Sequence, residues 1–237
     1  SAKFMVKGKI QQVLPTTDNL ILSYTGTSTY NITWVPTGMI NKVRIYYSLN
    51  DGSSYLPANE ITDAAGIDPV PSQKIWNIPD KIIGKHLKIQ VVDKDNDQTY
   101  GESAYTFEII GSLVLNAPNG AEVWTVGSSH NVTWARTGAI ATVKLEYSTD
   151  GGSTYPGLIN ASVNAANGTY PWTIPDAITN QGRVRISDNS DGTVFDISNN
   201  NFFIKGTVAL TSPNGGEEWV VSSGHNVTWT KNGSIAN

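Results

Sequence analysis

Residues 131–140 read NVTWARTGAI, and closely similar decapeptides occur at two other places in the chain. NITWVPTGMI stands at 31–40, and NVTWTKNGSI stands at 226–235. The tryptophans of successive copies are 100 and then 95 residues apart. A repeat of that length fits one whole domain rather than one turn of a solenoid. The sequence therefore predicts a series of similar domains.

Two other segments recur at about the same spacing, one after the decapeptide and one before it. The pairs are WNIPDKI (76–82) with WTIPDAI (172–178), and NAPNGAEVWTVGSSH (116–130) with TSPNGGEEWVVSSGH (211–225). A domain-sized unit, rather than one short motif, is therefore repeated.

These matches set the predicted domain boundaries. They predict one domain over residues 1–110, a second over 111–205, and the first third of another over 206–237. We expect the chain to be a piece of a longer array. The joins between domains are only a residue or two long, so we expect neighbouring domains to be stiffly coupled.

Within each unit, apolar and polar residues alternate with a period of two. Val143, Leu145 and Tyr147 alternate with Lys144 and Glu146, and similar alternation recurs in other segments. This pattern is typical of strands with one buried and one solvated face. About seven such strands per unit, separated by turn residues, predict an all-β fold of two-sheet antiparallel β-sandwiches.

Composition excludes several classes of function. The 237 residues carry a formal net charge of −4, which gives no basic face for nucleic acid. The absence of cysteine excludes disulfides, thiolate metal sites and cysteine nucleophiles. No apolar run approaches the roughly 20 residues needed to span a bilayer as a helix.

The stretch YSTDGGSTY at 147–155 allows two interpretations. Asp150 could act as a general base or a calcium ligand. Alternatively, the stretch is a hairpin tip in which Gly152 takes a turn conformation and Asp150 accepts hydrogen bonds from backbone amides of its own turn. A related stretch, YSLNDGSSY, stands at 47–55. That recurrence favours the hairpin.

A second acidic stretch, DKDNDQTYGE at 93–102, is the candidate metal site. Its acidic residues resemble the first half of a calcium loop, in which several hard oxygens converge on one ion. The candidate calcium ligands are Asp93, Asp95, Asp97 and Glu102. Gln98 and Ala104 occupy the positions of the glycine and the last glutamate of an EF-hand, so the loop is not of that type. The alternative is a solvated loop between strands. A looser acidic set in the second unit comprises Asp188, Asp191 and Asp196.

Aromatic residues are assigned mainly to the core. The recurring tryptophans are all predicted to be buried, and they form three sets: Trp34, Trp134 and Trp229; Trp76 and Trp172; and Trp124 and Trp219. A carbohydrate-binding platform would instead need exposed rings, and the candidates for it are Tyr46, Tyr100 and Tyr105. His130 and His225 recur at equivalent positions, which assigns them to the repeated unit rather than to a zinc site.

The order of these residues resembles a known repeat. The residues that carry the resemblance are Pro118, Asn119, Gly120, Trp124, Trp134, Asp150, Gly152, Trp172, Pro175 and Asp188. They resemble the Ig-like repeat of the amino-terminal part of fungal cell-wall glucan-synthesis proteins, which also recurs in tandem in large bacterial secreted and surface proteins. The first unit departs from it, because LPTTDNLILSY at 14–24 replaces the PNGGEEW-like segment. The resemblance implies Ig-like β-sandwiches that serve as stalk, spacer or lattice elements, with no catalytic residue set.

The stretch at 147–155 is also similar to the Asp-box turn of sialidase-type propellers, although Tyr155 replaces the usual tryptophan. An Asp-box recurs once per blade, whereas this stretch recurs once per hundred residues. The comparison therefore supports a turn in a sandwich rather than a propeller.

Together these features predict a non-catalytic structural module of a bacterial extracellular surface protein: a surface-layer lattice, a stalk or an adhesin spacer. The alternative is a glycan- or protein-binding accessory module of a secreted enzyme. An enzyme in its own right is disfavoured, because no G-x-S-x-G elbow occurs. Expected partners are neighbouring domains of the same longer protein or further copies of the chain. Residues 206–237 carry unpaired strand edges, which we expect to pair with another copy if they are ordered as they stand.

Overall fold

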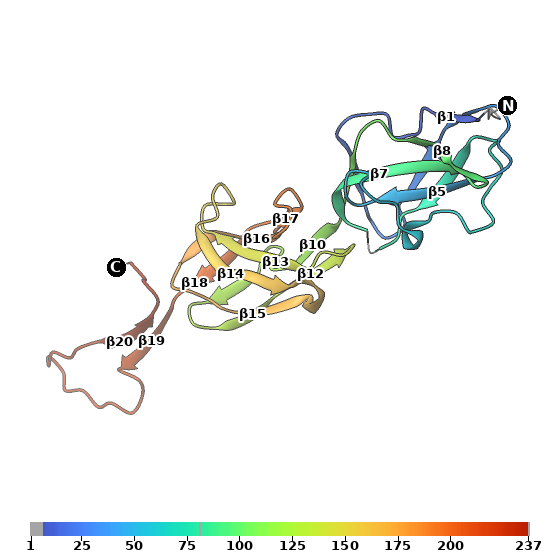
Figure 1. Cartoon of the computed structure of the whole chain (residues 1–237). Helices are drawn as coiled ribbons and strands as arrows, with labels where there is room; N and C mark the ends of the chain where they lie inside the picture. The colour runs from blue at the N-terminus through green and yellow to red at the C-terminus, as the bar shows by residue number, and fades with distance from the viewer. Residues whose placement is uncertain (1–6, 81, 237) are drawn as a thin grey trace, which may run out of the picture. The chain divides into compact units, whose positions relative to one another are not determined.

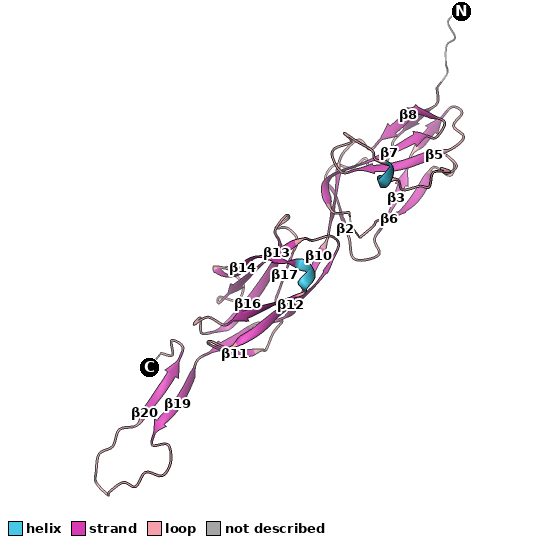
Figure 2. Cartoon of the chain, turned by 60° about the horizontal axis from the view of Figure 1, so that its bottom comes forward, coloured by secondary structure: helices cyan, strands magenta, loops and turns pink. Residues whose placement is uncertain are grey.

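The computed structural model describes residues 7–80 and 82–236, and that part of the chain is built almost wholly of strands and turns (Figures 1 and 2). The chain divides into two compact units. One comprises the residues up to Ser112 together with Thr137–Ala139, and the other comprises Leu113–Arg136 and Ile140–Asn237. Residues 206–236, here called the third segment, fall in the second unit. The division into three domains therefore stays a prediction.

Unit 1 contains three groups of paired strands. The largest sheet has the order β2–β9–β7–β5, with β8 also paired to β7; the smaller groups are β1–β4 and β3–β6. The strands are β1 (Lys9–Gln11), β2 (Leu20–Ser23), β3 (Thr29–Thr33), β4 (Val35–Thr37), β5 (Val43–Ser48), β6 (Gln73–Asn77), β7 (Gly84–Asp93), β8 (Asn96–Glu102) and β9 (Phe107–Ile110).

Unit 2 repeats this plan. One sheet has the order β10–β12–β15, and the other has the order β11–β18–β16–β13–β14, with β17 paired to β16. The strands are β10 (Ser112–Ala117), β11 (Val123–Thr125), β12 (Ser129–Thr137), β13 (Thr142–Ser148), β14 (Gly157–Asn164), β15 (Thr169–Thr173), β16 (Thr179–Asp188), β17 (Phe195–Ile197) and β18 (Phe202–Lys205). The third segment forms a hairpin of β19 (Thr207–Ser212) and β20 (Thr228–Asn232).

The fold is an all-β, Ig-like β-sandwich, as the alternation predicted. The expectation of purely antiparallel pairing needs one correction, because β2 runs parallel to β9 and β11 runs parallel to β18. In unit 2, β10 belongs to one sheet. The chain then crosses to the other sheet, where β11 pairs with β18, the last strand of that sandwich. In unit 1, Leu20–Ser23 fills this position although the PNGGEEW-like sequence is absent there.

The core lies between the two sheets of each sandwich, and its residues are those that the alternation placed inward. Val143 and Leu145 of β13 are fully buried, as are Val184 and Ile186 of the neighbouring strand β16. Burying a side chain of this kind contributes about 1.5–3 kcal/mol. The two strands pair in a regular antiparallel register, so their inward faces form one continuous apolar surface.

No helix within the described residues is both long and apolar enough to cross a membrane. The helical pieces in that part of the chain are 3-10 turns at Pro57–Asn59 and Ala165–Asn167 (Figure 2).

Candidate functional site

The turn at residues 148–154 is held together by the side chains of Ser148 and Asp150. The Ser148 hydroxyl accepts hydrogen bonds from the amides of Asp150 (3.1 Å) and Gly152 (2.9 Å), and it donates to Asp150 Oδ1 at 2.5 Å. Asp150 also accepts from the amide (3.0 Å) and the hydroxyl (2.6 Å) of Thr154. Gly152 has a φ of +91°, which a residue with a side chain rarely adopts. Both carboxylate oxygens of Asp150 therefore serve the turn.

These hydrogen bonds also set the charge state of Asp150. The hydroxyls of Ser148 and Thr154, followed by the Thr154 amide, hold the pKa of the Asp150 carboxyl well below its ordinary value. Donation to the charged form stabilises that form. A carboxylate with such a low pKa is a poor general base near neutral pH, since a catalytic base works best with a pKa close to the working pH.

Unit 1 builds the same turn with an uncharged residue. The Ser48 hydroxyl accepts from the amides of Asn50 (3.2 Å) and Gly52 (3.0 Å), and it donates to Asn50 Oδ1 at 2.7 Å. The Ser54 amide donates to Asn50 Oδ1 at 3.1 Å. Because an amide oxygen replaces the carboxylate, the turn does not depend on a negative charge at this position.

The four candidate calcium ligands do not converge on one point. Asp93 accepts from the amide of Asp95 at 3.0 Å, Asp97 accepts from the side chain of Gln98 at 3.2 Å, and Glu102 accepts from the side chain of Gln90 at 3.2 Å. Glu102 lies opposite Gln90, three residues along β7 from Asp93, or about 10 Å at the usual rise of a strand. The described part of the chain contains no group of three acidic or histidine residues placed to hold a metal ion. Calcium binding stays a prediction.

Asp188 is the equivalent of Asp93 in unit 2, and the two residues make the same kind of hydrogen bond in their turns. Asp93 pairs with Val43 at the end of β7, and Asp188 pairs with Val143 at the end of β16. Asp188 accepts from the amide of Ser190 at 2.8 Å, as Asp93 does from its own turn. Side-chain oxygens that accept from an amide two residues on are typical of tight turns. Both aspartates therefore close the turn that follows a long core strand.

The remaining acidic residues of unit 2 also make local contacts. Asp191 Oδ1 accepts from the amide and the hydroxyl of Thr193, and Asp196 Oδ2 accepts from the amide of Leu115 at 2.7 Å. Asp196 therefore connects β17 to β10, which belong to different sheets of unit 2.

The recurring tryptophans occupy matching core positions. Trp34, Trp76, Trp124, Trp134 and Trp172 are buried. The prediction is wrong for Trp219 and Trp229, which are 46% and 58% exposed, because the hairpin of the third segment has no second sheet packed over it within the described residues. Trp76 lies 5.4 Å from the Tyr47 ring in unit 1, and Trp172 lies 5.2 Å from the Tyr147 ring in unit 2. Rings enclosed in this way pack the sandwich and leave no face open for a sugar.

Sequence reasoning missed a stacked pair formed by Trp124 and His130. The two rings are nearly parallel, with centroids 4.5 Å apart and 6° between their planes, and His130 Nε2 lies 3.0 Å from the Ser128 hydroxyl. Trp219 and His225 repeat the pair. The signal was a tryptophan followed six residues later by a histidine in both copies.

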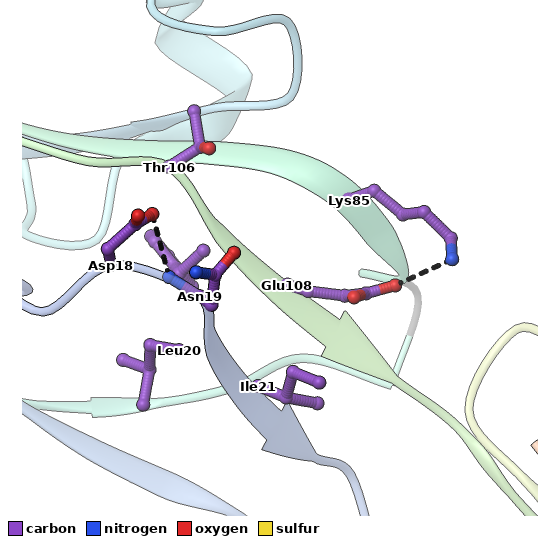
Figure 3. A pocket seen from close by; sticks show the side chains of 8 residues that line it. Asp18, Asn19, Leu20, Ile21, Lys85, Thr106 and Glu108 are labelled. Atoms are coloured by element: carbon purple, nitrogen blue, oxygen red, sulfur yellow. Dashed lines mark hydrogen bonds and ion pairs between the residues drawn. The ribbon is translucent and has the colours of Figure 1, made fainter. Parts of the chain in front are cut away.

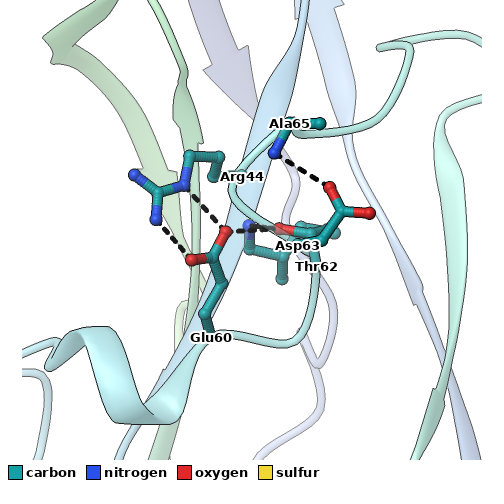
Figure 4. A network of polar contacts seen from close by, with 6 residues as sticks. Arg44, Glu60, Thr62, Asp63 and Ala65 are labelled. Carbon is teal, nitrogen blue, oxygen red and sulfur yellow. Dashed lines mark hydrogen bonds and ion pairs between the residues drawn. The ribbon is translucent and has the colours of Figure 1, made fainter.

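The outward face of the large unit 1 sheet carries a polar cluster around Arg44 (Figure 4). Arg44 Nε donates to Glu60 Oε1 at 2.7 Å, its Nη2 donates to Glu60 Oε2, and Thr62 donates to Glu60 Oε1 at 3.0 Å. The hydrogen bond from Arg44 lowers the pKa of Glu60. The guanidinium also lies 5.1 Å from the centre of the Tyr46 ring. Its charge is thereby paired, and the cluster fixes the loop that contains Glu60 against β5.

Two of the proposed glycan-contacting rings are exposed. Tyr100 on β8 and Tyr105 just after it are about half exposed, whereas Tyr46 is partly covered. A surface pocket nearby has residues that include Arg44, Tyr46, Tyr55 and Asp97 in its wall. Burial, with the Glu102 carboxylate beside it, raises the pKa of Tyr55, so this phenol stays protonated.

A second pocket in unit 1 is lined by residues at the start of the paired strands β2 and β9 and by Lys85 (Figure 3). Lys85 and Glu108 form an ion pair across 3.2 Å at its rim, and Asp18 accepts from the neighbouring amide of Asn19 at 2.9 Å. Thr106 supplies the hydroxyl in the wall, and no histidine accompanies it. This lining lacks the usual partner that activates a hydroxyl nucleophile.

No protein-family model matches the chain. Over 109 residues the chain is 26% identical to a probable oxalate decarboxylase of Arthroderma benhamiae; the match covers 46% of this chain and 27% of that protein. The chain thus spans about a quarter of the length of this curated relative.

Solved structures with a similar fold are tandem Ig and fibronectin(III)-like modules. A three-Ig fragment of titin is 9% identical with a TM-score of 0.41, covering 84% of this chain and 65% of that one. The four amino-terminal Ig domains of Dscam1 isoform 6.44 are 10% identical with a TM-score of 0.41, covering 85% and 47%. The fibronectin(III)-like modules of Clostridium thermocellum CbhA are 15% identical with a TM-score of 0.28, covering 83% and 94%. At such low identity these likenesses concern the fold alone.

Proposed function

We propose that the chain is a non-catalytic, structural segment of a bacterial extracellular surface protein, built from Ig-like repeats of the fungal glucan-synthesis type. It would serve as a spacer in a stalk or adhesin, or as an element of a surface layer. One observation carries the proposal: the residues that recur between the repeats make folding contacts. The serine turns, the buried tryptophans and the turn-closing aspartates each hold their own sandwich together.

A spacer and an enzyme differ in the role of their polar residues. A catalytic group usually has a perturbed pKa matched to its task and lies in a pocket with other polar groups. Asp150, which the sequence offered as a possible general base, has its pKa moved away from neutrality by contacts within its own turn. The recurrence of such a turn at residues 47–55 and 147–155 is more simply explained by folding than by chemistry.

The second candidate is a glycan- or protein-binding module, favoured by the exposed rings of Tyr100 and Tyr105. Tyr100 lies in register with Arg44, because both residues are paired with Val92. Affinity electrophoresis in gels that contain soluble cell-wall polysaccharides separates the two candidates. A spacer migrates at the same rate with and without polysaccharide. Retardation that is lost in Tyr100→Ala would contradict the spacer and establish glycan binding.

Light scattering with calcium at about 5–10 mM, and then with chelator, tests the type of structural role. Calcium-dependent assembly of the chain beyond a monomer would favour a surface-layer element. It would also support a role for the acidic loop at 93–102 in the contact between copies. A mass that does not change with calcium would favour a passive spacer.

A further inference from the structure

Strand β6 forms an open sheet edge in unit 1. It pairs with β3 along its whole length, and the two strands make a sheet of their own (Figure 2). No other strand within the described residues pairs with β6. An unpaired edge presents a row of amides and carbonyls to which another strand can be added.

The hydrogen bonds at the two ends of this pairing show which backbone groups face outward. The Ile78 amide donates to the Ser28 carbonyl at 3.0 Å, and the Trp34 amide donates to the Ser72 carbonyl at 3.2 Å. In an antiparallel pair, alternate residues exchange hydrogen bonds with the neighbouring strand. The even-numbered residues of β6 therefore bond to β3. The odd-numbered residues, with Ile75 at their centre, direct their amides and carbonyls to the open side.

Unit 2 blocks the same edge with a proline. Pro171 of β15 occupies the position of Ile75, since each lies opposite the asparagine of its N-x-T-W segment. The Ile174 amide donates to the Ser128 carbonyl at 2.9 Å, so Pro171 also lies on the outward-facing phase of its strand. Proline has no amide hydrogen, and it protects edge strands from the addition of another strand. Unit 1 lacks this protection.

The side chains of β6 are complementary to a second β6. Ile75 is 63% exposed, and Gln73 and Asn77, which share its face, are exposed and uncharged. An antiparallel copy with Ile75 opposite Ile75 would place Gln73 opposite Asn77. It would also place Lys74, the one charged residue of the strand, opposite Trp76. Like charges therefore do not face each other, and a pair of β-branched apolar side chains lies at the centre.

A pocket beside the same edge suits the lysine of such a copy. The pocket has a volume of about 280 Å³, and its wall includes Tyr47, Glu60 and Trp76. Residues opposite each other in a sheet point to the same face. Lys74 of the second copy would therefore lie on the Trp76 side of the sheet, where Glu60 supplies the opposite charge.

We propose that β6 is a self-association edge, to which a second copy of the chain adds its own β6 about a two-fold axis at Ile75. The contact is isologous, and it joins the two small sheets into one sheet of order β3–β6–β6–β3. Main-chain hydrogen bonds at the edge supply the affinity. The inference goes beyond the proposed function, because a spacer does not require this contact.

Three edge strands of unit 2 are obstructed, which leaves the second β6 as the fitting occupant. Pro171 interrupts β15. The Leu115 amide of β10 donates to Asp196 at 2.7 Å, and the Ser162 amide of β14 donates to the side chain of Asn160 at 2.8 Å. Amides that are already bonded in this way do not pair with an added strand.

Sedimentation equilibrium of the full chain in chelator tests the proposal without any contribution from calcium. We expect a reversible dimer with a Kd on the order of 0.1–1 mM, since one short strand pairing buries little surface. Ile75→Pro copies the proline of unit 2 and should weaken the dimer at least about tenfold. The reverse change, Pro171→Ile, opens the β15 edge and should increase association.

Disulfide formation tests the position of the two-fold axis. The chain has no cysteine, so a single one can be introduced at a chosen site. In the proposed dimer the two Cα atoms of residue 75 are about 5.5 Å apart, within reach of a disulfide. The matched control is Asn31→Cys on β3, an exposed residue opposite Ile75, whose two copies would be about 14 Å apart. With oxidised glutathione, Ile75→Cys should cross-link at least about tenfold faster than Asn31→Cys.

The outcomes that would overturn the proposal are separate from those that bear on the spacer. A wild-type chain that stays monomeric up to about 1 mM would overturn it. So would a folded Ile75→Pro chain, checked by circular dichroism, that associates as strongly as wild type. If Ile75→Pro fails to fold, the two cysteine variants decide, and equal cross-linking rates would overturn the proposal.

Discussion

Repeat 2 (residues 111–205) and the third segment contain closely similar decapeptides, NVTWARTGAI and NVTWTKNGSI, yet the two tryptophans differ in exposure. Trp134 is 4% exposed and Trp229 is 58% exposed. Glu122 and Glu217 accept from the amides of Asn119 and Asn214 in equivalent turns. The Trp–His pair is stacked in both places, and β19 pairs with β20 as β10 pairs with β12. The comparison separates what a short sequence forms by itself from what it forms only when distant strands of the same sandwich cover it.

The largest expected effect comes from truncating the two tryptophans. Trp134→Ala should destabilise unit 2 by about 3–5 kcal/mol, because it leaves a cavity and removes the hydrogen bond from the indole Nε1 to the Ala165 carbonyl, 2.9 Å long. Trp229→Ala should change the stability by less than about 0.5 kcal/mol. Urea unfolding followed by circular dichroism measures both variants.

Equal destabilisation by the two tryptophan substitutions would contradict the comparison, because it would mean that the third segment has a core of its own in solution.

Removing the buried turn hydroxyl should have the next largest effect. Ser148→Ala leaves the amides of Asp150 and Gly152 without their acceptor, and unsatisfied groups of this kind cost about 1–3 kcal/mol. Ser48→Ala should cost a similar amount in unit 1, since its hydroxyl is equally buried. Thermal unfolding of both variants measures the losses. The exposed Ser153 supplies the control Ser153→Ala, and a loss as large in the control would contradict a special role for the buried hydroxyl.

A smaller effect should distinguish the charged turn of unit 2 from the uncharged turn of unit 1. The pKa of Asp150 is lowered in the folded state, so its contribution is present above the ordinary aspartate pKa of about 3.9 and is lost as pH falls towards the folded pKa. Asp150→Asn removes this titration and copies Asn50. We expect the difference in Tm between pH 7 and pH 3 to be smaller in the variant.

The melting curves at the two pH values are compared between wild type and Asp150→Asn, so that other titrating groups cancel. An unchanged pH dependence of the unit 2 transition would show that the turn carboxylate does not couple to folding.

The smallest effect concerns the residue that holds the loop after β20. Asp176, of the WTIPD segment, accepts from the amide (2.8 Å) and the hydroxyl (2.6 Å) of Ser234, and these bonds lower its pKa. In unit 1, Asp80 accepts from the amide of Gly138 at 3.1 Å. Asp176→Ala should speed amide exchange at Ser234 without changing the unfolding transition of unit 2. A large loss of global stability would contradict this local role.

Sequence reasoning predicted the features that depend on near neighbours. The two-residue alternation located the core strands, and the recurrence of tryptophans located the matching core positions. In YSTDGGSTY, the side-chain hydrogen bonds of Ser148 and Asp150 within the turn join residues that are at most four apart, so the local sequence is enough to predict them. These signals also sufficed to predict a β-sandwich.

Features that depend on the path of loops could not be predicted in this way. Glu60 meets Arg44 only because the irregular segment after residue 48 returns to β5. Glu102 follows Asp93 closely in sequence, but strand geometry carries it away from the turn and places it opposite Gln90. The parallel pairing of β11 with β18 joins segments about 80 residues apart, and alternation alone does not specify strand direction.

Hydrogen exchange of the monomer tests the account most directly, because one sample contains both repeat 2 and the third segment. The account predicts that the ladder amides of Ser129–Thr133, paired with β15, exchange at least about a thousandfold more slowly than those of residues 224–228, which should exchange almost as fast as in an unfolded chain. Comparable protection in the two regions would contradict it, since the third segment would then be covered without the strands that cover repeat 2.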